Sequence, residues 1–104
     1  SLIGLSNFNG TYSLEYCHVF YAGCATTYEG CEITFLLENG KSITLKKGKM
    51  DYSVSPDQIQ SLLHYKVSKV RYQYGDNPTN TKFVEVDIKT KLAESIIELI
   101  KCIL

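Results

Sequence analysis

Two runs of alternating apolar residues meet at the dipeptide Asn39-Gly40, and this feature constrains the fold more than any other. The runs cover residues 31–37 and 42–46. An apolar residue at every second position is typical of a strand with one buried face. Asn-Gly tolerates the positive φ angles of a two-residue hairpin turn. The sequence therefore predicts an antiparallel β-hairpin over residues 31–46.

Four further segments have the composition or alternation of strands. They cover residues 12–21, 50–54, 67–74 and 82–88. Residues 67–74 and 82–88 flank a loop rich in Gly, Asn and Pro, so they are expected to pair with each other. Lys69 and Arg71 would then face Glu85 and Asp87 across the pair. We interpret these charges as a solvated ladder and not as a catalytic carboxylate site.

Two helices complete the expected secondary structure. Ser55-Pro56 followed by Gln58 forms a capping box with proline at the first helical position, which predicts a helix over residues 56–64. Residues 90–104 carry a broad apolar stripe at helical spacing. The chain is therefore predicted to form a single α+β domain over residues 1–104. Its antiparallel sheet would have five to six strands in the order β-β-β-β-α-β-β-α, with the short helix and the C-terminal amphipathic helix packed on one face.

The second half of the chain resembles a group of small uncharacterised bacterial proteins. The resemblance covers residues 52–102 and rests on packing patterns and not on chemical motifs. The matching residues are Val54-Ser55-Pro56-Asp57-Gln58-Ile59, Leu62, Val67-Ser68-Lys69-Val70-Arg71-Tyr72, Val86-Asp87-Ile88, Ala93-Glu94, Ile97 and Lys101-Cys102. The resemblance implies an α+β domain with a C-terminal helix, and it implies no activity.

The composition argues against several classes of function. Eleven basic and eleven acidic side chains give a formal net charge of zero, which does not suit a nucleic-acid-binding protein. No apolar run approaches the roughly 20 residues that span a bilayer. No basic start of a signal peptide is present, so we expect no membrane segment and assign no compartment. No phosphate loop or cofactor motif occurs, and we predict no cofactor.

The charges are nevertheless segregated along the chain. Residues 1–40 contain four glutamates and no lysine or arginine, whereas residues 41–71 contain seven basic and two acidic side chains. An acidic segment with tyrosines suits an interface with a basic protein partner, as in small inhibitors and immunity proteins. We therefore predict a non-enzymatic protein-binding domain. Its candidate binding residues are Tyr21, Tyr28, Glu29 and Glu32.

The four cysteines lack the close spacing of a zinc site, so no metal site is predicted. Cys24 and Cys31 bracket a loop and are the pair that we expect to form a disulfide in an oxidising compartment. Cys17 and Cys102 are expected to pack as small core residues.

Two alternatives to the binding domain remain open. A small cysteine-dependent enzyme or redox protein could use Cys17 or Cys24 with His18 or His64. We assign no catalytic residue. His18 is expected on the same strand face as Tyr16 and Phe20, which favours a packed role. His64 fits the C-terminal end of a helix, where the helix dipole favours a cation. A homodimeric structural subunit could instead pair through part of the apolar stripe of residues 90–104.

Overall fold

The computed structural model describes residues 2–20 and 23–104 of the chain. It confirms the predicted α+β class, with antiparallel strands and two α-helices. The strands are β1 (Leu2–Phe8), β2 (Thr11–Cys17), β3 (Val19–Phe20), β4 (Gly23–Cys24), β5 (Glu32–Leu37), β6 (Ser42–Lys46), β7 (Tyr52–Val54), β8 (Val67–Gly75) and β9 (Thr81–Asp87). The helices are α1 (Pro56–His64), the short 3-10 helix η1 (Pro78–Asn80) and α2 (Thr90–Ile103).

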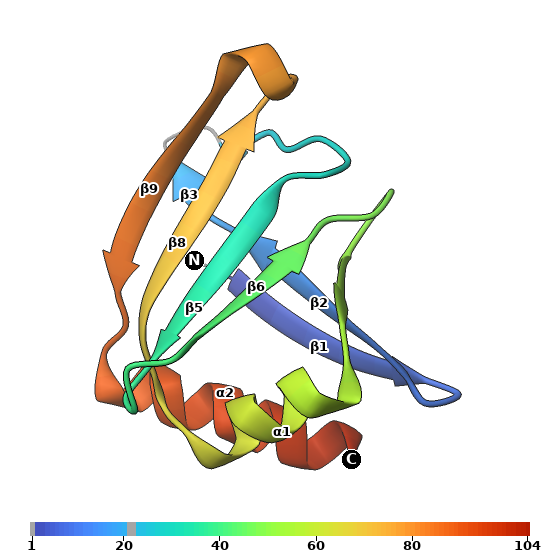
Figure 1. Ribbon diagram of the computed structural model, residues 1–104, viewed down its shortest axis with the longest axis vertical. Helices are drawn as coiled ribbons and strands as arrows, with labels where there is room; N and C mark the ends of the chain where they lie inside the picture. The colour runs from blue at the N-terminus through green and yellow to red at the C-terminus, as the bar shows by residue number, and fades with distance from the viewer. Residues whose placement is uncertain (1, 21–22) are drawn as a thin grey trace.

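The strands form three small sheets, so the predicted single sheet of five to six strands is wrong. The sheets have the orders β6-β5-β8-β9, β1-β2-β7 and β3-β4. The chain bends after β6, where the Gly48 N–H donates to the Asp51 carbonyl. This bend directs β7 onto β2, and a bridge between Lys47 and Tyr52 links the two larger sheets. In Figure 1 the four-stranded sheet lies in front, with β1, β2 and β3 behind it.

The N-terminal region differs most from the prediction. Residues 12–21 were expected to form one strand, but β2 ends at Cys17 and β3 begins at Val19. An unpredicted strand, β1, precedes them and forms a hairpin with β2 through Asn9-Gly10. Met50 was expected in a strand and instead lies in the bend before β7, where its side chain is 83% exposed.

Both helices occur where the sequence predicts them. The Ser55 hydroxyl accepts a hydrogen bond from the Gln58 N–H, and the Gln58 side chain accepts one from the Ser55 N–H, which confirms the capping box. Helix α2 packs against α1, β1 and β8 through a stripe in which Ala93, Ile96 and Ile100 are buried. Figure 1 shows both helices together at one end of the sheets.

The hydrophobic core lies between the two larger sheets and the helices. Burial of these apolar side chains is the main favourable contribution to folding. The largest fully buried side chains of this core include Leu14, Ile33, Phe35, Leu45, Tyr52, Ile59, Leu62, Val70, Tyr72 and Ile100. Because alternate residues of β5, β6 and β8 enter this core, the residues between them must face away from it.

Candidate functional site

The loop of residues 25–31, which contains two of the predicted binding residues, is tied to three strand ends. The Gly75 N–H donates to the Thr26 carbonyl at 2.8 Å, and the Gly30 N–H donates to the Lys47 carbonyl at 2.9 Å. The Tyr28 hydroxyl lies 2.5 Å from the Thr81 hydroxyl at the start of β9. The loop is therefore ordered by contacts with the ends of β6, β8 and β9.

The predicted binding residues occupy different positions around this loop. Tyr28 is half-buried because its hydroxyl bonds Thr81, so it supports the loop more than it projects from it. Glu29 is exposed at the turn before β5. Glu32 lies on β5, opposite Lys46 on β6, and its N–H donates to the Gln73 side chain. Tyr21 lies outside the described residues.

The acidic segment is not neutralised by ion pairs in the part of the chain that the structure describes. The ion pairs there are Lys66–Glu94, Lys69–Asp87 and Lys101–Glu98. None of them involves a glutamate from residues 2–40. The Lys47 ammonium instead bonds the Thr27 hydroxyl, and Lys46 faces Glu32 across the strand pair without an ion pair. Glu29 and Glu32 therefore form no ion pair within the described residues.

The cysteine predictions need correction. Cys24 forms a disulfide with Cys17 and not with Cys31, because pairing of β3 with β4 folds Cys24 back beside the end of β2, with a Cα–Cα distance of 5.3 Å. Cys31 is a buried thiol whose sulfur accepts a hydrogen bond from the Tyr28 N–H. Cys102 is exposed on α2 and is not a core residue.

These cysteine positions bear on the enzyme alternative. Both candidate nucleophiles, Cys17 and Cys24, are held in the disulfide, so neither carries a thiol in this structure. Among residues 2–20 and 23–104, no three His, Cys, Asp or Glu side chains come together as a metal site would require. None of the helices in the described residues combines the length and apolar character needed to cross a membrane.

The side of the four-stranded sheet that faces away from the core is here called the outer face. In Figure 1 this side is turned toward the viewer, with the other strands behind the sheet and the helices below it. The register brings its residues into rows across the strands. They are Glu32, Thr34 and Leu36 from β5; Ser42, Thr44 and Lys46 from β6; Lys69, Arg71 and Gln73 from β8; and Phe83, Glu85 and Asp87 from β9.

The predicted charge ladder lies on this outer face. Lys69 is the cross-strand partner of Asp87, with 3.8 Å between ammonium and carboxylate, which confirms the expected pairing. Arg71 is the cross-strand partner of Glu85, but its guanidinium lies over the ring of Phe83 at 4.0 Å from the ring centre. Phe83 is 57% exposed although it sits within a strand. Phe83, Glu85 and Asp87 occupy every second position of the strand, so their side chains share one face. This alternation was the sequence signal that Phe83 faces outward.

Beneath the four-stranded sheet, aromatic rings form a contiguous cluster. The ring of Tyr72 lies 4.9 Å from that of Tyr16 and 6.5 Å from that of Tyr74. Burial raises the pKa of Tyr52 above its ordinary value, and the nearby Tyr72 phenol adds to the shift; burial also raises the pKa of Tyr72. The Tyr52 and Tyr72 hydroxyls lie close enough to interact, but their contact does not have the geometry of a hydrogen bond, so the buried Tyr52 hydroxyl is left without one. Tyr52 and Tyr72 belong to the hydrophobic core, and Tyr16 and Tyr74 pack against it.

Hollows on the surface of the described residues include the following. One of about 550 Å³ lies between the β1–β2 hairpin and the bend at residues 47–51. A second of about 320 Å³ lies beside Phe20 and Tyr74, and a third of about 660 Å³ separates β1 from α2. A comparison of the chain with models of protein families, with curated proteins and with solved structures finds no match in any of the three.

Proposed function

We propose that the protein is a non-enzymatic protein-binding domain that contacts its partner through the outer face. The observation that carries this proposal is the exposed Phe83 ring with the Arg71 guanidinium stacked on it. Aromatic and arginine side chains supply most of the binding energy in many interfaces. The stacking also limits the motion of both side chains before binding, which lowers the entropy lost when a partner immobilises them.

The rest of the outer face supports the same role. Leu36 adds a partly exposed apolar side chain, and Thr34 and Thr44 are joined by a hydrogen bond between their hydroxyls at 3.0 Å. Three basic and three acidic side chains balance each other within the face: Lys46, Lys69, Arg71, Glu32, Glu85 and Asp87. A neutral face with apolar anchors and a polar surround suits a protein partner better than a nucleic acid.

Glu29, at the border of this face, adds a negative charge to its balanced set of charges and so favours a partner of opposite sign. Glu29 lies in the turn just before β5, and Glu32 begins that strand. Because neither carboxylate is ion-paired within the described residues, a lysine or arginine of the partner could pair with each. We therefore propose a partner with a basic contact surface. Small acidic-faced inhibitors and immunity proteins provide an analogy for this mode of binding.

The proposal is tested by capturing partners from the source cells with the wild-type chain and with defined variants. Phe83→Ala and the double change Glu29→Lys with Glu32→Lys should each lose the same captured protein. Glu98→Lys, a charge reversal on the exposed side of α2, should retain it. Circular dichroism confirms that every variant is folded. Capture of the same proteins at the same yield by all variants would contradict the proposed surface.

A further inference from the structure

Strand β1 is an edge of the three-stranded sheet whose outer backbone groups pair with no strand of the described residues, although α2 packs against it and the Asn7 side chain donates to the Ile103 carbonyl at 2.8 Å. Its strand partner in the described part of the chain is β2, on one side only. Its sequence, Leu-Ile-Gly-Leu-Ser-Asn-Phe, contains neither a charged residue nor a proline. Edge strands usually carry such residues, which block pairing with another chain. The edge strand β9 follows this rule, since it carries Lys82, Glu85 and Asp87.

The turn between β1 and β2 shows which backbone groups face the free edge. Asn9 and Gly10 have φ angles of 51° and 83°, as expected for a type I′ turn closed by a hydrogen-bonded pair, here Phe8 and Thr11. Hydrogen-bonded and non-hydrogen-bonded pairs alternate along an antiparallel ladder. The odd-numbered residues of β1 therefore direct their N–H and C=O groups away from β2; these residues are Ile3, Leu5 and Asn7.

The exposed side chains of β1 match each other when two copies of the strand run antiparallel. Leu2 and Phe8, at the two ends, are 67% and 78% exposed. When Leu5 of one copy lies opposite Leu5 of the other, Leu2 of each copy lies opposite Phe8 of the other. Gly4 then lies opposite Ser6, so small residues face each other between the two apolar pairs.

The backbone favours the same register. Pairing Leu5 with Leu5 and Ile3 with Asn7 brings together only residues whose backbone groups face the free edge. Each such pair exchanges two hydrogen bonds, which gives about six across the two strands. The Leu2–Phe8 pairs are then non-hydrogen-bonded pairs, in which side chains approach most closely.

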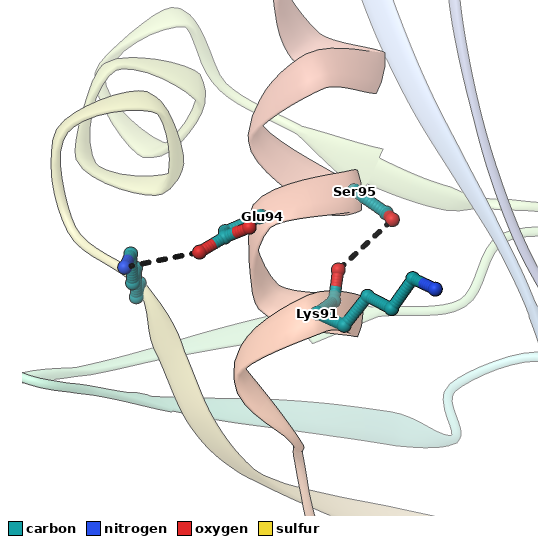
Figure 2. A network of polar contacts seen from close by, with 4 residues as sticks. Lys91, Glu94 and Ser95 are labelled. Carbon is teal, nitrogen blue, oxygen red and sulfur yellow. Dashed lines mark hydrogen bonds and ion pairs between the residues drawn. The ribbon is translucent and has the colours of Figure 1, made fainter.

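The groove beside β1 has room for an added strand. It measures about 660 Å³ and is lined by Leu2 and Ile3 of β1 and by charged, polar and apolar residues of α2, which are Lys91, Glu94, Ser95, Glu98, Leu99 and Cys102. Figure 2 shows Ser95 and Lys91 on the side of α2 turned toward the N-terminal strands, whereas Glu94 points the opposite way, toward its ion pair. The apolar stripe of α2 is meanwhile buried in the core. A second copy of the chain can therefore bind more readily at the free edge of β1 than at the apolar stripe of α2.

We propose that two copies of this chain form a symmetric dimer by pairing their β1 strands in this register. The two three-stranded sheets then join into one continuous sheet across the two-fold axis. The absence of charge along β1 allows this arrangement, because no like charges meet at the axis. The dimer uses a different surface from the outer face, so either proposal can fail without the other.

Sedimentation velocity on the full 104-residue chain tests the dimer and its register together. The wild-type protein should sediment with a mass of roughly twice the monomer mass of 11.7 kDa. Leu2→Lys with Phe8→Lys places like charges opposite each other at both ends, and it should weaken the dimer about tenfold or more. Leu2→Lys with Phe8→Glu places opposite charges there and should restore association, with a dependence on salt.

Restored association of the Lys–Glu variant would show that the two copies contact each other at these positions. Residues 2 and 8 of one strand are about 20 Å apart and cannot pair with each other. Phe83→Lys, which changes an exposed apolar residue on the outer face and away from β1, is the matched control and should leave the dimer intact. A wild-type mass of 11.7 kDa up to roughly millimolar concentration would overturn the proposal. Equal association of the Lys–Lys and Lys–Glu variants would overturn the register and hence the interface.

Discussion

Removal of the Tyr52 hydroxyl should stabilise the protein, although most substitutions of buried residues destabilise. Tyr52 is 2% exposed, and its hydroxyl has no hydrogen-bond partner of good geometry. A buried hydroxyl left without a partner costs about 1–3 kcal/mol. The void left by Tyr52→Phe is roughly 10 Å³, which costs only about 0.2 kcal/mol. We expect the free energy of unfolding at pH 7 to rise by about 1 kcal/mol or more.

The same substitution should change how stability depends on alkaline pH. Below the ordinary tyrosine pKa of 10.0, Tyr52 is protonated in both the folded and the unfolded chain, so this contribution is constant. Above pH 10 the unfolded phenol ionises, whereas burial keeps the folded one protonated because its pKa is raised. Stability therefore falls by about 1.4 kcal/mol per pH unit for this group. Because the unfolded phenol is only half ionised at its pKa of 10.0, the advantage of Tyr52→Phe should grow by about 1 kcal/mol between pH 10 and 11 and approach the full slope above that.

Urea unfolding followed by circular dichroism at pH 7, 10 and 11 measures both effects. Tyr65→Phe is the matched control, because Tyr65 is 40% exposed and its change should stay within about 0.5 kcal/mol at pH 7. A Tyr52→Phe protein less stable than wild type at pH 7 would show that the hydroxyl has a hydrogen-bond partner. A pH dependence identical to that of wild type would refute the inference from burial.

Two further predictions concern the stability of the fold. Replacing Cys17 and Cys24 by Ser should lower the free energy of unfolding by about 2.5 kcal/mol, because the disulfide closes a loop between positions 7 apart. Thermal unfolding with and without reductant measures the loss of stability. An unchanged melting temperature would argue against the bond. Ser55→Ala should cost about 1 kcal/mol by removing the N-cap of α1. Ser53→Ala, an exposed serine two positions earlier, should cost much less in the same urea titration, and equal losses would contradict the capping role.

Local signals predicted the elements that depend on neighbouring residues. The hairpin of β5 and β6 follows from Asn39-Gly40, and α1 follows from its capping box. The pairing of β8 with β9 follows from alternation, which also placed Lys69 and Arg71 on the same face as Glu85 and Asp87. Strand β1 carried the same Asn-Gly signal at Asn9-Gly10. Its alternation is weak, however, because glycine and serine occupy the outward positions between Leu2 and Phe8.

Contacts between distant segments decided the features that the sequence could not predict. Cys24 lies seven residues from both Cys17 and Cys31, so spacing could not select the disulfide; the pairing of β3 with β4 did. The bond between Tyr28 and Thr81 joins residues 53 positions apart, and it determines that Tyr28 supports its loop. The division into three sheets depends on the bend after β6, which directs β7 to β2.

Titration calorimetry of the captured partner with wild type and with Phe83→Ala measures directly whether the outer face binds that partner. We expect loss of the exposed ring to weaken binding about tenfold or more, as for an interface anchor. Leu104→Ala, an exposed apolar change at the end of α2, should leave the dissociation constant unchanged. Unchanged affinity in Phe83→Ala would contradict the proposal that the outer face binds the partner.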